Sequence, residues 1–296
     1  MKRNDIILVT LIIILIFSYL LSFVRNRAQS EKRESVKSAL INPKNSEAIT
    51  RFEFSSQDGV IQIFKDGDND FWKICRPGNA ECLPADSKKL ENLLSDFIKV
   101  RNVYKISDKI TRNSSFGLTD TSAFSVRYYY NGTFDELIFG NQDFSLSSRY
   151  MMSGRNTSVY EINDEISKYL SSSVQFWAEP YLISREVLGN GIENNLQRVL
   201  AEGKLVSADS RLLELRHGGL PSKEELDASG PEIFTLTLEF GNKSAAILHF
   251  YPLDTNEGTE KGFIVSENCT SSSGKAQVFY SKISAWTYSR IKEITL

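Results

Sequence analysis

The sequence lacks the short motifs on which common catalytic and nucleotide-binding folds depend. It contains no G-x-S-x-G, no H-E-x-x-H and no G-x-x-x-x-G-K-[ST], so the nucleophile elbow, the zinc-protease helix and the phosphate-binding loop are missing. Histidine occurs only twice, as His217 and His249. The S-x-x-K spacing from Ser272 to Lys275 lies in a loop-like composition. We therefore predict no catalytic, cofactor-binding or metal-binding residue, and expect a protein that is not an enzyme.

An excess of charge of one sign is also missing. The chain carries 35 basic and 37 acidic residues, for a net charge of -2. Nucleic-acid-binding proteins need a concentrated basic surface, because the phosphate backbone dominates their affinity. We expect no nucleic-acid partner.

Cysteine is scarce, with Cys75, Cys82 and Cys269 as its three occurrences. Cys75 and Cys82 flank RPGNAE, a Pro-Gly turn that can bring its two ends together, so they are a candidate disulfide. Such a bond persists only in an oxidising compartment. A zinc site would need a second pair of Cys or His residues, and none is nearby. Cys269 is left as an inert thiol or as one half of an intermolecular bridge.

One long hydrophobic run stands out. Residues Ile6 to Val24 contain no charge, and nineteen residues at about 1.5 Å each form a helix of about 28 Å, close to the thickness of a bilayer's hydrocarbon core. A cleaved signal peptide has a shorter apolar core and a small-residue site directly after it. Here Arg25 and Arg27 come before the only such match. We expect a retained transmembrane helix, rather than a cleaved leader or a buried core helix.

The charges beside this run leave its orientation open. The positive residues are Lys2 and Arg3 before it, and Arg25, Arg27, Lys32 and Arg33 after it. Counted alone, they favour a cytoplasmic position for the rest of the chain. Long domains, however, cross the membrane largely regardless of flanking charge, and the candidate disulfide favours the extracytoplasmic side.

Periodicity predicts sheets with packed helices after residue 45. Alternating segments at 49–54, 60–64 and 71–75 predict a β-meander, and Asp66 to Asp70 is interpreted as a hairpin turn rather than a calcium loop. An amphipathic helix is expected from Ser87 to Val100, with Asp86 or Ser87 as its N-cap. Asn131-Gly132 predicts a hairpin, and 149–153 and 158–162 form a further strand pair. The many aromatic residues between Phe124 and Tyr150 are interpreted as packing rather than as a glycan or nucleotide platform.

The second half of the chain repeats this order. A second amphipathic helix is predicted over Glu193 to Glu202, followed by a strand pair near 233–251. Tyr128 and Tyr130 match Leu238 and Phe240 at an offset of 110, and Leu137 matches Ile247 at the same offset. We infer an internal duplication in which the second copy lacks the tryptophan hairpin.

The order of these motifs resembles a known family. A hydrophobic anchor precedes I-x-R-F-E-F and F-W-K-I; then follow P-A-D before L-x-x-L-L, F-G-L-T-D, L-I-F-G, an R-Y strand and S-V-Y-E-I. This order is similar to that of the bacterial domain of unknown function 4340 family, over most of residues 1 to 185 and weakly beyond. The resemblance implies a membrane-anchored extracytoplasmic protein associated with gliding-motility-type ABC transporter components. It supplies no catalytic residues.

These observations together predict an α+β chain with an N-terminal transmembrane helix and two related units, each an antiparallel sheet with packed helices. The expected segments are a cytoplasmic tail (1–5), the membrane helix (6–24), a charged helical stalk (25–45), a first unit (46–180) and a second, reduced unit (181–296).

The expected function is that of an accessory or scaffold subunit at the bacterial inner membrane, with most of the chain in the periplasm. Its expected partner is an ABC-transporter permease or auxiliary subunit. An anchored binding protein for a small ligand or glycan is the first alternative, and it predicts an aromatic-lined pocket between the units. An uncharacterised hydrolase is the second, and it predicts convergent Ser, Lys or His side chains with perturbed pKa values.

Overall fold

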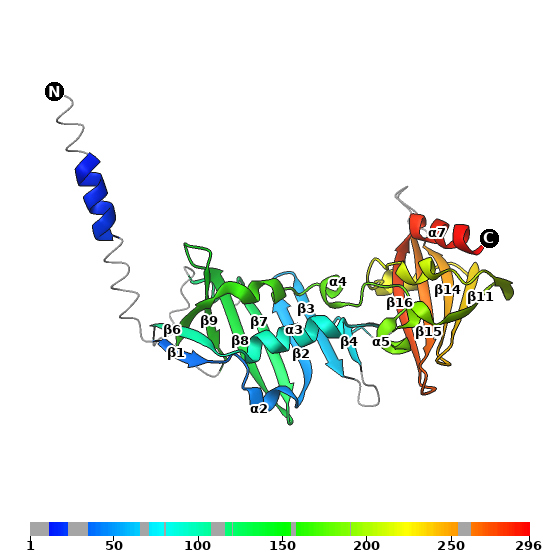
Figure 1. Cartoon of the computed structure of the whole chain (residues 1–296), viewed down its shortest axis with the longest axis horizontal. Helices are drawn as coiled ribbons and strands as arrows, with labels where there is room; N and C mark the ends of the chain where they lie inside the picture. The colour runs from blue at the N-terminus through cyan, green and yellow to red at the C-terminus, as the bar shows by residue number, and fades with distance from the viewer. Residues whose placement is uncertain are drawn as a thin grey trace, which may run out of the picture.

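Two antiparallel sheets lie side by side and give the body an elongated shape (Figure 1). The computed structural model describes residues 12–22, 35–65, 71–79, 81–107, 116–119, 121–154, 158–189, 191–253 and 262–296. The sheets have ten and six strands, and the helices that pack on them are short. This arrangement fits the predicted α+β class.

The larger sheet has the strand order β1-β6-β10-β9-β8-β7-β2-β3-β4-β5. Its strands are β1 (Ser35–Ser38), β2 (Ile49–Ser56), β3 (Gly59–Lys65), β4 (Trp72–Cys75), β5 (Cys82–Pro84), β6 (Arg101–Ser107), β7 (Phe124–Tyr130), β8 (Thr133–Gln142), β9 (Ser148–Ser153) and β10 (Val159–Asn163). The predicted hairpin at Asn131-Gly132 is confirmed: both residues have positive φ, and Tyr130 pairs with Thr133.

Four short helices accompany this sheet: α2 (Pro43–Ser46), α3 (Ser87–Ile98), η2 (Asp164–Tyr169) and α4 (Val174–Trp177). The α3 helix begins as predicted, because the Asp86 carboxylate accepts a hydrogen bond from the Lys89 backbone N–H at 2.9 Å. Its apolar stripe buries Leu90, Leu93 and Phe97. The helix thereby covers one face of the sheet (Figure 1).

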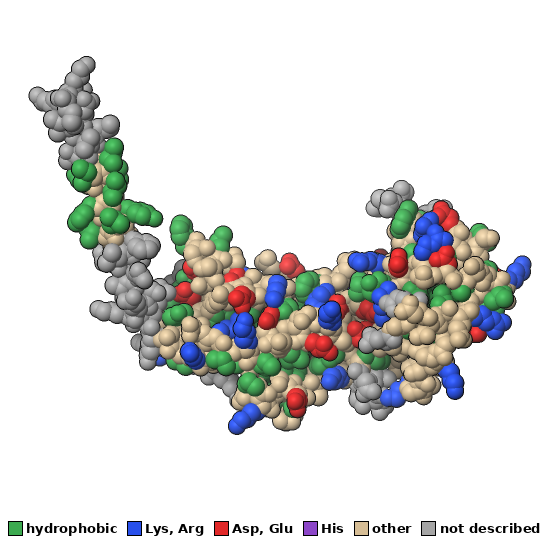
Figure 2. Space-filling model, in the orientation of Figure 1, with side chains coloured by type: hydrophobic (Ala, Val, Ile, Leu, Met, Phe, Trp, Pro, Cys, Tyr) green, Lys and Arg blue, Asp and Glu red, His purple; other side chains and the backbone are tan. Residues whose placement is uncertain are grey.

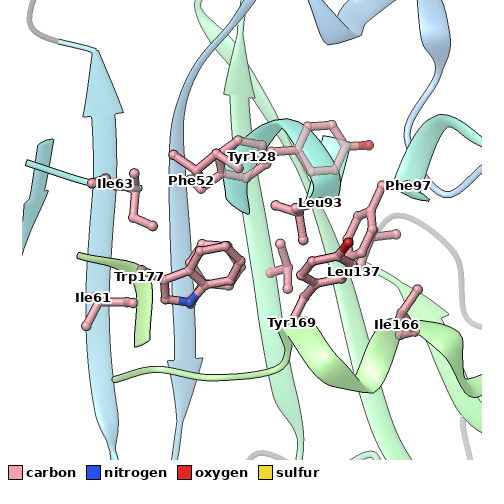
Figure 3. Close-up of a cluster of buried hydrophobic side chains, with 14 of the residues drawn as sticks. Phe52, Ile61, Ile63, Leu93, Phe97, Tyr128, Leu137, Ile166, Tyr169 and Trp177 are labelled. Carbon is pink, nitrogen blue, oxygen red and sulfur yellow. The ribbon is translucent and has the colours of Figure 1, made fainter. Parts of the chain in front are cut away.

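The centre of this core is Trp177, which is fully buried. Its ring stacks on Phe54 at a centroid distance of 4.8 Å and on Tyr169 at 6.3 Å. Figure 3 shows it among side chains from β2, β3 and η2. The indole N–H donates to the Ser171 carbonyl at 2.8 Å, so the polar edge of the ring is also satisfied.

The smaller sheet has the order β12-β11-β13-β14-β15-β16. Its strands are β11 (Leu196–Ala201), β12 (Lys204–Val206), β13 (Phe234–Phe240), β14 (Ala245–Leu253), β15 (Gly262–Thr270) and β16 (Ala276–Ser284). The helices of this part are α5 (Arg185–Leu188), η3 (Ile192–Asn194), η4 (Ser210–Glu214), α6 (Lys223–Asp227) and α7 (Ala285–Thr295). A separate buried cluster, which includes Phe234, Leu236 and Phe250, forms its core.

The two sheets share one topology. The neighbours β3-β2-β7-β8-β9-β10 correspond strand for strand to β12-β11-β13-β14-β15-β16, as an internal duplication predicts. The pairing corrects one detail of the predicted alignment. Val126 pairs with Leu137, whereas Leu236 pairs with Leu248, because the turn after β13 is one residue longer. Leu137 therefore corresponds to Leu248, and both are buried.

The helix predicted over Glu193 to Glu202 is wrong. Only η3 is helical there, and residues 196–201 form β11. Pairing with β13 decides the outcome, since it buries Val199 and Ala201 on the core side of the sheet. Tertiary pairing here overrides a helical periodicity that was real but short.

The N-terminal region is described in part. Residues 12–22 are helical, and the remainder of the predicted span lies outside the described residues, as does the hairpin turn predicted for 66–70. Among the residues that the structure describes, no helix has both the length and the apolar character needed to cross a membrane. The stalk prediction is wrong for Ser35–Ser38, which pair with β6 as a strand instead of continuing a helix.

Removal of the central indole is expected to be costly. Trp177→Ala should lower the free energy of unfolding by about 3–5 kcal/mol, through lost burial and the cavity left behind. Trp286→Ala is the matched control: that side chain is 73% exposed, and its loss should cost less than about 0.5 kcal/mol. Urea unfolding of both variants checks this, and equal losses would contradict the assignment of Trp177 to the core.

Candidate functional site

A ladder of backbone hydrogen bonds connects the two sheets, and the candidate site lies along it. Residues 177–179 pair with the edge of the larger sheet: Glu179 N donates to Pro84 O at 2.9 Å, and Asp86 N donates to Trp177 O at 2.8 Å. Residues 180–182 then pair with 215–217, through Leu182 N to Leu215 O at 2.8 Å. Finally, Gly218 and Gly219 bond to Lys282 of β16 at 2.6 and 2.9 Å.

Side chains reinforce this ladder on both sides. Ser87, at the N-terminus of α3, donates two hydrogen bonds to the Glu186 carboxylate of α5. Its backbone N–H donates one at 3.0 Å and its hydroxyl donates the other at 2.7 Å. A carboxylate there satisfies free helix N–H groups and opposes the positive end of the helix dipole. Lys73 reaches Gln277 at 2.8 Å. The two units therefore contact each other through backbone, polar and charged groups.

Two buried carboxylates meet at Ser184, in the middle of this junction. The Glu179 carboxylate accepts from the Ser184 hydroxyl at 2.9 Å and from the Arg185 N–H at 2.7 Å. Glu267, on β15, accepts from the Ser184 backbone N–H at 2.8 Å. Glu179 and Glu267 are only 5% and 4% exposed. We call Glu179, Ser184, His217, Glu267 and Cys269 the junction cluster.

Burial controls the protonation of this cluster. It raises the pKa of Glu179 to about 8, although hydrogen bonds from Arg185, Ser184 and Glu186 act in the opposite direction. It also raises the pKa of Glu267 to about 7, against hydrogen bonds from Ser184 and Cys269. Burial and the nearby Glu267 carboxylate raise the pKa of the Cys269 thiol well above its usual value. Cys269 is therefore a poor nucleophile near neutral pH.

His217 supports the backbone ladder. Its Nδ1 accepts from the Gly219 N–H at 3.0 Å, which assigns the proton to Nε2, and Nε2 lies 2.6 Å from the Glu179 carbonyl oxygen. Burial lowers the pKa of His217, so the neutral ring is favoured. Both ring nitrogens are thus occupied by backbone groups, which is the arrangement of a structural histidine.

The junction cluster resembles catalytic chemistry in its residue types but not in its accessibility. Ser184 and Cys269 are each 1% exposed, so no substrate atom reaches them in this conformation. Ser272 and Lys275, the residues of the S-x-x-K spacing, lie in the turn between β15 and β16 rather than on a helix. Within the described residues, no group of three or more potential ligands could hold a metal ion.

A large hollow lies between the units, beside the ladder. It has a volume of about 930 Å³ and is lined by the β2–β3 turn, residues 170–175, residues 218–220, Arg76 and Lys282. Phe124 is its single aromatic lining residue, and serine and glycine predominate. The glycan hypothesis predicted an aromatic-lined pocket, whereas this hollow, which we call the junction groove, mixes serine and glycine with aliphatic side chains. Lys282 is paired with Glu225 at 2.9 Å.

The two predicted disulfide cysteines lie on adjacent strands. Cys75 of β4 pairs in register with Cys82 of β5, at a Cα–Cα distance of 4.6 Å, and a disulfide joins them. The bond fastens the edge strand onto which residues 177–179 pair. Cys269 is a buried free thiol and does not reach the surface.

The family of the chain follows from comparison with known sequences. The family described as a domain of unknown function (DUF4340) matches residues 72–242, more than half of the chain. The chain belongs to this family. The match begins later and ends later than the resemblance suggested, so it leaves out the hydrophobic run but includes residues 177–219 of the junction. Searches of curated proteins and of solved structures found no match.

The DUF4340 match includes Glu179, Ser184 and His217, which sequence reasoning missed as a group. One signal was available for Glu267. It lies between Val265 and Cys269, at a position of an apolar strand whose side chain faces the core. A charged residue at such a position indicates a buried polar partner. No comparable signal marked Glu179, because its partners come from a loop.

Protonation of Glu267 predicts a pH-dependent stability. A carboxyl whose pKa rises from 4.5 unfolded to about 7 folded stabilises the protein fully below pH 4.5 and loses this effect as the pH rises through 7. The unfolding free energy of the parent should therefore fall between pH 5 and pH 8. Glu267→Gln should remove up to about 3 kcal/mol of that fall, since one pKa unit corresponds to about 1.4 kcal/mol.

Denaturant unfolding at a series of pH values checks this expectation. Glu239→Gln is the matched control, because Glu239 is exposed on β13 and pairs with Arg198 at the surface. Its free energy of unfolding should change with pH in the same way as that of the parent. If the free energy of unfolding of Glu267→Gln also changes with pH in this way, the carboxyl of Glu267 does not take up a proton on folding.

Proposed function

We propose that this DUF4340 protein is a non-catalytic accessory or scaffold subunit of a bacterial envelope complex. In this proposal the hydrophobic run Ile6 to Val24 holds it in the inner membrane, and the two sheets lie on the extracytoplasmic side. The partner is an ABC-transporter permease or auxiliary subunit, as the family resemblance implies. The protein recognises that partner through its surface and supplies no chemistry of its own.

The observation that carries this proposal is the exposed Trp286. It begins α7, at the end of the body far from β1, and its side chain is 73% exposed (Figure 1). A tryptophan left in water costs hydrophobic free energy that a partner surface can recover. Tryptophan and arginine are also the residues most enriched among the energetic hot spots of interfaces.

The surroundings of Trp286 indicate the chemistry of a partner segment. Trp286 lines a hollow of about 320 Å³ together with Leu215, Ile294, Arg211, Arg216 and Arg290, with Glu214 as the acidic lining residue. Arg211 and Arg290 are paired with Asp209 and Glu293 on exposed positions. This hollow suits a segment that presents an apolar side chain next to a carboxylate. Elsewhere on the face shown in Figure 2, basic and acidic side chains are interspersed.

Tethering makes a small contact surface sufficient. A protein confined to the membrane plane meets a membrane partner at a raised effective concentration, so that weak contacts produce stable association. The connected sheets then hold Trp286 and the hollow that it lines, which we call the Trp286 surface, at a defined distance from the anchor. A scaffold needs this fixed geometry, whereas an enzyme needs an accessible cluster of reactive groups.

Crosslinking in membranes followed by affinity purification of the full chain tests the proposal. We expect a membrane-protein partner to be recovered, and Trp286→Ala to reduce its recovery at least about tenfold, as loss of a hot spot does. The folded state of this variant should be unchanged, because the side chain is exposed.

Leu205→Ala is the control for this experiment. Leu205 is 68% exposed on β12 and lies outside the hollow, so its loss should leave recovery unchanged. Recovery of no membrane-protein partner by the parent would contradict the accessory-subunit function. Equal recovery of the partner by the parent and by Trp286→Ala would show that Trp286 does not take part in binding the partner.

A second candidate is an anchored binding protein for a small ligand, which the junction groove favours. Its lining of serine hydroxyls and aliphatic side chains, with one aromatic ring, suits a ligand with both hydrogen-bonding and apolar groups rather than a stacked sugar ring. Ser172 contributes to this lining and bonds to Ser56 at 2.7 Å across the groove.

Thiol labelling of intact cells tests the orientation. On the extracytoplasmic side, Cys75 and Cys82 should be oxidised, and should react with a membrane-impermeant maleimide only after treatment with a reductant. Cys269 is buried and should react only after denaturation. Free Cys75 and Cys82 thiols that become accessible only on lysis would place the sheets in the cytoplasm.

A further inference from the structure

One corner of the ten-stranded sheet combines several exposed apolar side chains. Val36, Val100, Phe144 and Leu146 are 55%, 60%, 106% and 68% exposed. The strand register brings them to the same region, since Val36 pairs with Val103, Val103 with Ile162, and Ile162 with Arg149. Val100 precedes β6, and residues 143–147 precede β9, so both turns lie at the same end of the sheet. We call these four residues the apolar corner.

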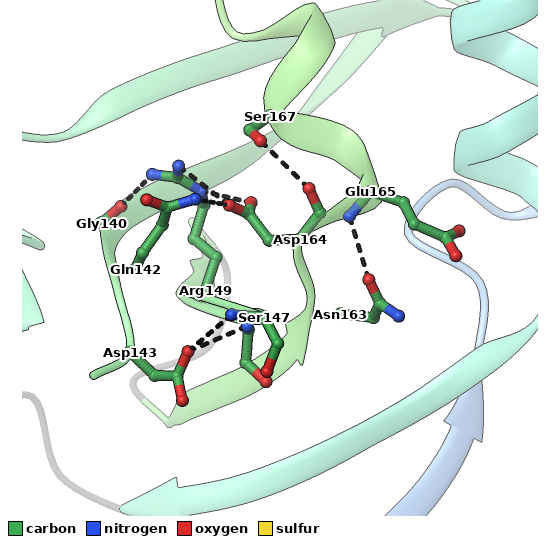
Figure 4. Close-up of polar contacts among 10 residues, drawn as sticks. Gly140, Gln142, Asp143, Ser147, Arg149, Asn163, Asp164, Glu165 and Ser167 are labelled. Atoms are coloured by element: carbon green, nitrogen blue, oxygen red, sulfur yellow. Dashed lines mark hydrogen bonds and ion pairs between the residues drawn. The ribbon is translucent and has the colours of Figure 1, made fainter. Parts of the chain in front are cut away.

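The loop that carries Phe144 and Leu146 is held rigidly. The Asp143 carboxylate accepts from the Ser148 N–H at 2.9 Å (Figure 4). It also accepts from the Ser145 hydroxyl at 2.7 Å, so its charge is directed into the loop. Leu146 has a φ of 58°, a conformation that is unfavourable for a leucine. Its strain is maintained by the loop although the side chain gains no burial, which points to a contact outside the chain.

The base of this loop is equally fixed. Arg149 on β9 donates to Asp164 at 2.6 Å and to the Gly140 carbonyl at 2.6 Å, and Asp164 N donates to Ser147 O at 3.0 Å (Figure 4). The Arg149 and Asp164 side chains are 16% and 4% exposed. A preorganised apolar tip loses little conformational entropy when it enters another phase.

The sequence indicates what the apolar corner contacts. Ten residues, 25–34, separate the hydrophobic run from Ser35, and a fully extended chain of that length spans at most about 35 Å. The chain enters the body at β1, the strand that carries Val36. The apolar corner therefore includes the strand through which the anchor joins the body, and a linker of at most about 35 Å connects the two. Lys37 and Lys99 are exposed beside it, and Glu165 is the exposed acidic residue at the same end.

We propose that the apolar corner rests in the lipid interface of the membrane that holds the anchor. Phenylalanine and leucine partition into this interface, while lysines remain at the level of the headgroups. The contact would give the body a second attachment and so fix its orientation relative to the membrane. This inference rests on the membrane anchoring proposed above.

An environment-sensitive fluorophore on Phe144→Cys in the full chain tests this contact. The chain is reconstituted into vesicles of phosphatidylethanolamine and phosphatidylglycerol. The introduced thiol is the one that labels, because Cys269 is buried and Cys75 is bonded to Cys82. We expect a blue-shifted emission, and several-fold stronger quenching by nitroxide lipids than for the same fluorophore on Leu205→Cys.

Flotation of the same vesicles separates the two levels of the proposal. Chains that float, with a fluorophore at position 144 as exposed to water as that at 205, would overturn the lipid contact and leave the anchor intact. Chains that do not float would overturn the anchor, and the lipid contact with it. Protection of position 144 that appears only when a second membrane protein is added would assign the corner to a protein partner instead.

Discussion

The backbone ladder between β5 and β16 is the contact on which the rest of the structure depends. Each sheet presents an edge strand whose N–H and C=O groups need partners, and an unpaired edge invites association with other chains. Here residues 177–182 and 215–219 fill the space between the edges and bond to both. The two units thus become one elongated body, and the disulfide holds β5 in the position that the ladder requires.

The ladder also explains why charged residues are buried at the junction. Its loops present the N–H groups of Ser184 and Arg185 to the carboxylates of Glu267 and Glu179, which accept hydrogen bonds from them. Burying a carboxyl group is costly unless it is protonated or well hydrogen-bonded, and both remedies are present. The raised pKa values are therefore a consequence of joining two sheets and need no catalytic explanation.

The proposed scaffold role follows from this construction. In that proposed role, the apolar corner near the end where the chain enters would contact the membrane, and the exposed tryptophan near the other end would contact a partner. Between them the junction contains reactive residue types that are sealed from solvent. The junction groove beside the ladder is the feature that keeps ligand binding as a second candidate.

The sequence by itself determined the local features whose causes are local. The hairpin at Asn131-Gly132, the N-cap of α3 at Asp86 and the recurrence of the β7–β8 hairpin as β13–β14 follow from turn chemistry, capping and alternation, and all are present. Tertiary structure decided what depends on distant partners. Residues 196–201 form a strand because they pair with β13, and Ser35–Ser38 form a strand because they pair with β6. Glu179, Ser184, His217 and Glu267 meet only because two sheet edges meet, and no spacing along the chain encodes that encounter.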